Sequence, residues 1–385
     1  MIEWAGWRGP GRDGHAAWLP ASLPKDLKPK WKKRLRSPGV GGIAATAKYV
    51  VASDREGGDT LDAFRCLDAN TGNELWKISY AAKGDLDYGS SPRATPLIHG
   101  DHVYLFGAFG HLNCVKLTSG QIVWKKDVRK EFRVTSKMVW GHASSPLIVD
   151  NQLIVNPGGP EASVVALDPL TGKVIWQSPG DASAFASFLR MEINGQTQII
   201  GYEATSIGGW NPVDGKRLWK HTPPRPNDFN VPTPLVYRDK LVLTTENNGT
   251  RLFEFNSERA LNDVPIAVNE DLAPDTHTPV IVGDRLFGVW NELQCLDLKN
   301  GLKTLWTADA TTFQNYVSMI ASQDKVLIAG IHGEVLLIDA LADSYRVISE
   351  IRLIDDDSGV FSHPAIVGNR LYIRGSSDIR CFVLE

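Results

Sequence analysis

The sequence predicts an all-β protein: an eight-bladed β-propeller in which each blade is a four-stranded antiparallel sheet. Three observations lead to this fold class. A motif that ends in Trp recurs along the chain, a second motif that begins with Pro precedes it, and both return at intervals of one or two repeat lengths. Repeats of about 40–50 residues that hold several short strands each are typical of propeller blades.

The Trp motif reads ALDPLTGKVIW from Ala166 to Trp176. Its other copies are Cys66–Trp76, Cys114–Trp124, Gly209–Trp219 and, with one extra residue, Cys295–Trp306. Asp168 can cap a turn with its carboxylate, and Gly172 can adopt the positive φ that a β-carbon resists. The motif therefore predicts the third strand, the turn and the fourth strand of a blade. We expect the recurring Trp to fill the wedge between neighbouring blades.

The Pro motif places a turn pair, such as Gly-Asp or Asp-Asn, four and five residues after the proline. It recurs at Pro96, Pro146, Pro234, Pro279 and Pro364. Its apolar residues predict the first strand of a blade, and the turn pair suits a tight hairpin that leads into the second strand. Two of the intervals between these prolines are nearly double the others, which predicts degenerate copies around residues 190 and 320. An eighth copy lies around residue 45.

The ends of the chain predict how the ring closes. The last repeat, Pro364–Glu385, supplies three strands and ends before any Trp strand. Trp31 lies one repeat length before Trp76, so residues 25–36 are expected to complete the last blade and leave no open edge. The prediction is one domain over residues 1–385, with an N-terminal extension (1–24), a closing strand (25–36) and the blades (40–385).

The four cysteines occupy one position of the repeat. Cys66, Cys114, Cys295 and Cys381 stand where the other copies have Ala166 and Gly209, which indicates a small buried site on the third strand. With one cysteine per blade, the thiols are expected to lie too far apart for disulfides. We therefore predict free, buried cysteines that act as small apolar side chains.

The composition is that of a globular protein rich in turns. The net charge is −3, 22% of residues are charged and 43% are hydrophobic. These values exclude a disordered or collagen-like chain, and no nucleic-acid partner is predicted. Basic clusters in residues 25–36 and 125–133 fit solvent-exposed strands at sheet edges better than a nucleic-acid site. No transmembrane segment is predicted, because no stretch approaches the roughly 20 consecutive apolar residues that a membrane-spanning helix needs.

With its looser copies, ALDPLTGKVIW resembles the pyrroloquinoline quinone (PQQ) repeat, over nearly the whole chain. That repeat builds the eight-bladed propellers of quinoprotein alcohol dehydrogenases and of non-enzymatic relatives, among them the propeller lipoprotein of the outer-membrane β-barrel assembly machinery. Three further segments are similar to secreted PQQ-repeat proteins of planctomycete-type bacteria: WAGWRGPGRDG (4–14), SPRATP (91–96) and WGHASSP (140–146).

The resemblance implies PQQ and Ca²⁺ as cofactors of the enzymes, but their binding features are not found in the residues. Those enzymes pack PQQ against a disulfide between adjacent cysteines, and this sequence has no adjacent Cys pair. They hold Ca²⁺ with convergent carboxylate and amide groups, whereas the nearest candidates here stand at scattered repeat positions: Glu203, Glu246 with Asn247, and Asp275. No catalytic residue, cofactor or metal site is therefore predicted.

A ligand is expected where the loops that enter the first strands converge on the central channel. The candidates on this face are Arg93, Lys137, Trp140, His142, Asn230, His277, Tyr316 and His363, accompanied by Tyr88, Phe229 and Phe361. Such cationic, aromatic and imidazole groups suit an anionic or sugar-like ligand or a peptide. The alternative is that they only fill the channel. The three histidines stand at unequal distances before their prolines, so no metal ring is predicted.

Complete blade motifs without cofactor motifs favour a non-catalytic binding or assembly scaffold in the cell envelope. Its partner would be a protein or a small polar ligand on the loop face. Two alternatives stay open: a PQQ- and Ca²⁺-dependent oxidoreductase like the alcohol dehydrogenases, and a sugar- or polymer-binding module. A periplasmic or secreted location is expected although the first residues show no charged-then-apolar leader, and a cytoplasmic location also stays open.

Overall fold

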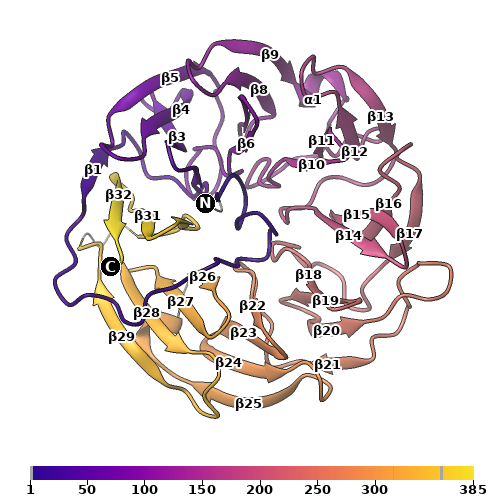
Figure 1. The fold of residues 1–385 in the computed structure, drawn as a ribbon. Coiled ribbons are helices and arrows are strands. Elements are labelled where there is room, and N and C mark those ends of the chain that lie inside the picture. The colour runs from indigo at the N-terminus through magenta and orange to yellow at the C-terminus, as the bar shows by residue number, and fades with distance from the viewer. Residues whose placement is uncertain (1–2, 315, 356–358) are drawn as a thin grey trace.

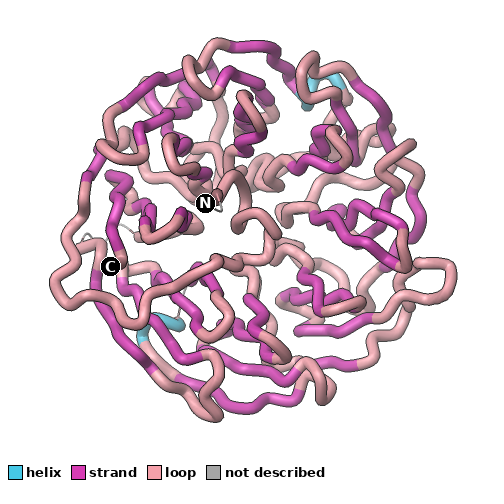
Figure 2. The backbone as a smooth tube through the Cα atoms, in the orientation of Figure 1, coloured by secondary structure: helices cyan, strands magenta, loops and turns pink. Residues whose placement is uncertain are grey.

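The chain forms a closed ring of β-sheets around a central axis (Figure 1). The computed structural model describes residues 3–314, 316–355 and 359–385, and within these residues there are eight four-stranded antiparallel sheets. The predicted eight-bladed propeller is thereby confirmed. Loops make up most of the rest (Figure 2); the helical elements are α1 (Val128–Glu131) and the 3₁₀ turn η1 (Thr311–Phe313).

Blades 1 to 4 follow the order of the sequence, with the first strand of each nearest the axis. Blade 1 contains β2 (Ala44–Ala45), β3 (Tyr49–Glu56), β4 (Leu61–Asp68) and β5 (Glu74–Ala81). Blade 2 contains β6 (Leu97–His99), β7 (His102–Phe106), β8 (His111–Lys116) and β9 (Ile122–Asp127). Blade 3 contains β10 (Leu147–Val149), β11 (Gln152–Val155), β12 (Val164–Leu167) and β13 (Val174–Ser178). Blade 4 contains β14 (Leu189–Ile193), β15 (Gln196–Glu203), β16 (Ser206–Trp210) and β17 (Arg217–His221).

Blades 5 to 8 complete the ring. Blade 5 contains β18 (Leu235–Tyr237), β19 (Lys240–Thr245), β20 (Gly249–Phe253) and β21 (Ala267–Asn269). Blade 6 contains β22 (Val280–Val282), β23 (Arg285–Trp290), β24 (Glu292–Asp297) and β25 (Lys303–Ala308). Blade 7 contains β26 (Val317–Ala321), β27 (Lys325–Gly330), β28 (Glu334–Asp339) and β29 (Val347–Arg352). Blade 8 contains β30 (Ala365–Val367), β31 (Arg370–Arg374), β32 (Asp378–Val383) and the N-terminal strand β1 (Trp31–Arg34).

The Pro motif forms the inner hairpin of its blade, as predicted. In blade 3, Val149 pairs with Gln152, so that Asp150 and Asn151 alone make the turn, and both have a positive φ. Turns of this handedness match the twist of the flanking strands. The degenerate copies expected around residues 45, 190 and 320 correspond to β2, β14 and β26.

The Trp motif places a small residue directly opposite each recurring Trp. In blade 3, Ala166 of β12 pairs with Trp176 of β13, and a β-bulge follows between Ala166 and Leu167. The other pairs are Cys66 with Trp76, Cys114 with Trp124, Gly209 with Trp219, Cys295 with Trp306 and Cys381 with Trp31. The small residue leaves room for the indole, and all four cysteines are buried and free, as predicted.

Each of four Trp rings packs on the turn glycine of the next blade. Trp124 Nε1 donates a hydrogen bond to Pro169 O (2.9 Å), and a β-carbon on Gly172 would lie 2.7 Å from the Trp124 ring. The same arrangement joins Trp31 to Gly72, Trp76 to Gly120 and Trp176 to Gly215. One motif therefore supplies a glycine to the preceding blade and a Trp to the following one.

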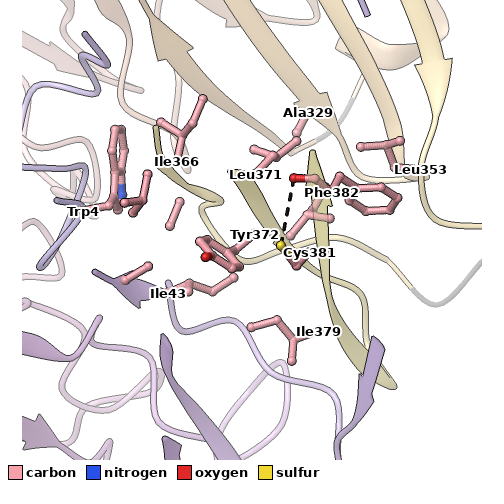
Figure 3. Packing of buried hydrophobic residues seen from close by; sticks show 14 of the residues in the cluster. Trp4, Ile43, Ala329, Leu353, Ile366, Leu371, Tyr372, Ile379, Cys381 and Phe382 are labelled. Atoms are coloured by element: carbon pink, nitrogen blue, oxygen red, sulfur yellow. Dashed lines mark hydrogen bonds between the residues drawn. The ribbon is translucent and has the colours of Figure 1, made fainter. Parts of the chain in front are cut away.

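Strand β1 closes the ring by pairing with β32, Trp31 lying opposite Cys381. Figure 3 shows the packing at this closure, where Trp4, Ile43 and Tyr372 belong to one buried cluster. The cluster also takes in Ala329 of blade 7, so it joins the two ends of the chain to the blades on either side.

The segment Trp4–Ala16, called here the axial segment, lies in the centre of the ring (Figure 1). It bonds to residues at the inner strands of six blades: Ala45, Ile98, Pro146, Thr233, Pro279 and Ala321. From there the chain runs outward to β1 at the rim. Leu19 and Leu23 are buried along this path, and Leu23 N donates to Ser349 Oγ (2.7 Å).

Candidate binding site on the propeller axis

A pocket of about 210 Å³ lies where the loops that enter the inner strands converge, and we call it the axial pocket. Trp7 of the axial segment lines it from within the channel, and Trp7 Nε1 is held by a hydrogen bond to Thr233 Oγ1 (2.9 Å). His363 packs edge-on against Trp7, with 5.4 Å between ring centroids, and stacks on Trp4. The axial segment therefore occupies the channel beneath the pocket.

Aromatic side chains surround the pocket. Six of the loops that enter the inner strands contribute one ring each, and together these six form what we call the aromatic collar: Tyr88, Trp140, Phe185, Phe229, Tyr316 and Phe361. Trp140 is central, because its ring centroid lies 4.7 Å from those of Phe185 and Phe229. Tyr88 connects Trp140 to Tyr316, which packs on Phe361. All but Phe229 line the pocket directly.

Five of the eight residues proposed from the sequence line the pocket, namely Arg93, Trp140, His277, Tyr316 and His363. The other three lie elsewhere. Lys137 is exposed outside the pocket lining. His142 is buried against Phe106, with 5.0 Å between ring centroids, and the amide of Asn230 donates to the backbone oxygens of Glu203 and Ala204.

Among the aromatic lining residues, sequence reasoning missed Phe185 and Trp7. Phe185 precedes β14 in a blade whose Pro motif is degenerate, so no proline marked the end of its loop. Trp7 belongs to the WAGWRGPGRDG segment, which has no counterpart in the repeats. Its two tryptophans and two arginines could have indicated the packing, because an extension with such large side chains is expected to pack against the rest of the fold.

Of the described residues that line the pocket, Arg93 is the one with a cationic side chain. Its guanidinium donates to the backbone oxygens of Ser91 (3.0 Å), Gly89 (2.8 Å) and Asp87. Within the described part of the chain, no carboxylate lies within 4.0 Å of the guanidinium nitrogens. Burial lowers the pKa of Arg93 to about 10, so the side chain is still charged at neutral pH.

The two pocket histidines are neutral at pH 7. Burial lowers the pKa of His277 and of His363 to about 3, and the nearby Arg8 guanidinium lowers both further. His277 Nε2 accepts a hydrogen bond from Val289 N (2.9 Å), which fixes that nitrogen as the unprotonated one. The histidines therefore add no positive charge to the pocket.

The donor set of the pocket does not fit PQQ with Ca²⁺. Among the residues that the structure describes, no aspartate or glutamate lines the pocket, and Arg93 is the one cation that would face the carboxylates of the quinone. Glu203 is instead buried, where it pairs with Arg217 and accepts from Ser163 Oγ (2.6 Å). Glu246 and Asp275 also lie outside the lining. In the described residues no group of three or more His, Cys, Asp or Glu side chains could hold a metal ion.

The four cysteine thiols are buried and free. Burial raises the pKa of Cys66, Cys114 and Cys295 to about 12 and that of Cys381 to about 11, so all four stay protonated. A thiolate is the reactive form of cysteine. As to membranes, neither helical element in the described ranges has the length and apolarity to cross one.

The chain is similar to known proteins in both sequence and fold. The family described as outer membrane protein assembly factor BamB matches residues 24–138 and 62–308. A protein of that name from Shewanella oneidensis is 22% identical, covering 90% of this chain and 97% of its own. The crystal structure of BamB from Moraxella catarrhalis superposes with a TM-score of 0.66 at 15% identity, covering 93% of this chain and 99% of that one.

The fold is shared with enzymes as well. A quinohemoprotein alcohol dehydrogenase from Pseudomonas putida has a TM-score of 0.70 at 12% identity, covering 100% of this chain and 80% of the enzyme. At such identities a structural likeness shows the fold and not the chemistry. The sequence family, in contrast, matches well over half of the chain. The protein belongs to the family of the outer membrane protein assembly factor BamB.

Proposed function

We propose that this protein is a non-catalytic scaffold that binds partner proteins during assembly of the cell envelope. The observation that carries the proposal is the family match, supported by alignment with an assembly factor over 90% of this chain and 97% of that relative. We place the protein at the outer membrane, on its periplasmic side. A propeller suits such a role, because its loops form one broad face on a rigid ring.

The chemistry of the axial pocket supports a binding function. In the described residues its lining combines aromatic rings, neutral histidines and a single arginine, without a carboxylate or a thiol. General acid–base catalysis is most effective when the pKa of the group lies near the working pH, and the pKa values of the two pocket histidines, at about 3, lie far below it. Recognition of a partner needs only shape, apolar surface and a few polar groups.

Cross-linking in the native host tests the proposal. A tagged copy at native expression level would be cross-linked in cells and purified from the envelope fraction, and the captured proteins would be quantified by mass spectrometry. We expect enrichment of the proteins that insert β-barrels into the outer membrane. A tagged, unrelated periplasmic protein is the control.

The rival function, a quinoprotein oxidoreductase, is tested on the purified protein. Calorimetry with PQQ and Ca²⁺ is expected to show no saturable binding at micromolar concentration, and alcohol is expected to reduce no dye. Saturable PQQ binding together with alcohol-dependent dye reduction would overturn the scaffold proposal in favour of the enzyme.

A further inference from the structure

We propose that the axial pocket takes one aromatic side chain of a partner polypeptide, with an adjacent carboxylate placed against Arg93. The choice of a polypeptide as occupant rests on the proposed scaffold function. The chemistry of the occupant rests on the pocket itself: its size, its aromatic lining, its charge and its closed end.

The size of the pocket suits a single ring. Its volume is about 210 Å³. Pockets for drug-sized ligands and cofactors are larger, on the order of 300–1,000 Å³. A benzyl or indole group with its backbone outside the pocket is therefore a better occupant than a multi-ring cofactor or a folded oligosaccharide.

Two of the six rings of the aromatic collar are exposed and the other four are half-buried. Tyr88 is 66% exposed and Phe229 48% exposed, whereas Trp31, Trp76, Trp176 and Trp219 between the blades are each 7% exposed. Clustered apolar surface of this kind marks interaction sites. Aromatic rings gain from edge-to-face and offset contacts with another ring, and an inserted aromatic side chain is the commonest anchor at protein interfaces.

A cation without a carboxylate partner and a donor without an acceptor define the polar part of the occupant. Arg93 carries a positive charge without a carboxylate partner in the described residues. Trp140 Nε1 is buried and has no hydrogen-bond acceptor among the residues the structure describes. A carboxylate beside the inserted ring would pair with the first donor, and a carbonyl or carboxylate oxygen with the second. The charge of Arg93 would repel a cationic occupant, although aromatic rings alone can bind cations.

The axial segment makes the pocket blind. Trp7 lines the pocket from within the channel, and its indole is fixed by Thr233. Arg8 and Arg12 are buried behind it, with hydrogen bonds to the backbone oxygens of Pro279 (2.7 Å) and Pro146 (2.8 Å). A side chain can therefore enter from the loop face and stop at Trp7, which is the geometry of an anchor and not of a pore.

Small blocked amino acids test the inference on the purified full chain. N-acetylphenylalanine, its amide and N-acetylalanine would be titrated in turn, with binding followed by calorimetry and by the fluorescence of the protein's tryptophans. We expect saturable binding of N-acetylphenylalanine, about tenfold weaker binding of the amide because a charge-assisted hydrogen bond is lost, and no binding of N-acetylalanine.

Variants separate the two halves of the site. Arg93→Gln is expected to bind the acid and the amide equally. Tyr88→Ala, at an exposed position where folding is not at risk, is expected to weaken both by fivefold or more. Lys137→Gln, on the same face but outside the pocket, is the matched control and is expected to bind like the wild type. Thermal unfolding of each variant verifies that it is folded.

Several results would overturn the inference: equal binding of N-acetylalanine, an unchanged preference for the acid in Arg93→Gln, or saturable binding of maltooligosaccharides in place of the aromatic acid. The test is independent of the proposed function. If the pocket fails while envelope assembly proteins are still captured by cross-linking, the scaffold function stands and the pocket assignment falls. If the pocket binds and no such protein is captured, the scaffold function falls.

Discussion

At the scale of single residues, the Trp motif is explained by contacts on both sides of each blade boundary. Asp168 accepts hydrogen bonds from the backbone N–H groups of Leu170 and Thr171 and so caps the turn. Gly172 has a φ of 68° and lies under Trp124 of the preceding blade. The capping and the φ could be predicted from the motif. The partner of the glycine could not, because it depends on which blades are neighbours in space.

Replacing this glycine separates backbone strain from steric clash. Gly172→Ala is expected to destabilise the fold by about 3 kcal/mol or more, since about 1–2 kcal/mol arises from a left-handed L-residue and the rest from a β-carbon 2.7 Å from Trp124. Gly195→Ala is the control: its φ is 77° but open space surrounds the new carbon. It is expected to cost about 1–2 kcal/mol. Equal losses in urea unfolding would contradict the interblade contact.

The buried Asp62 gives a residue-scale prediction on pH. Burial raises the pKa of its carboxyl from 3.8 to about 6, although Arg55 Nη1 donates to it at 2.6 Å. The folded state therefore holds this proton more tightly than the unfolded state, so stability present below pH 4 is lost as the pH rises to about 6.

An amide at position 62 removes this titration. Relative to the wild type, Asp62→Asn is expected to gain up to about 3 kcal/mol of unfolding free energy between pH 4 and pH 7, at about 1.4 kcal/mol per pKa unit. Because the change also removes the carboxylate that pairs with the buried Arg55, this relative gain is the quantity that tests the titration. Chemical unfolding across this pH range measures the difference. If the unfolding free energy of the variant minus that of the wild type is constant with pH, or falls as the pH rises, then folding does not raise the pKa of this carboxyl.

At the scale of elements, the regular strands were predictable and the segments between them were not. The inner hairpins follow from a proline and a turn pair, and β1 follows from the spacing of Trp31 and Trp76. The axial segment escaped prediction because it repeats nothing and forms isolated bridges instead of strands. The collar residues also stand at unequal distances from their strands, so their convergence depends on loop paths.

The axial segment is expected to stabilise the ring as well as to close the pocket. Trp4 is 2% exposed and packs in the closure cluster, whereas Trp18, just beyond the segment, is 38% exposed. Trp4→Ala is expected to cost about 3–5 kcal/mol of unfolding free energy. The matched change Trp18→Ala is expected to cost within about 0.5 kcal/mol. Hydrogen exchange should accelerate first in β2 and β30, and unchanged exchange there would contradict a structural role for the segment.

At the scale of the whole molecule, the fold could be predicted from the sequence repeats. The proposed function, in contrast, rests on the match to a protein family. The repeats identify eight blades because every blade must bury the same surfaces. The repeated residues form turns and contacts between blades, so they indicate the fold and not the function. The pocket adds what the repeats omit: rings from five loops, a guanidinium without a carboxylate partner in the described residues, and a segment with two buried arginines that closes the channel. These features come from non-repeating residues, which no motif identifies.

The most direct test of the scaffold function is the amount of β-barrel protein in the outer membrane of the native host. Quantitative mass spectrometry of outer membranes would compare the wild type, a strain lacking this protein and the same strain complemented with the full chain. We expect β-barrel proteins to fall at least twofold in the deletion strain and to return on complementation, while periplasmic proteins stay constant. Unchanged β-barrel levels, with a loss of PQQ-dependent alcohol oxidation instead, would contradict this expectation.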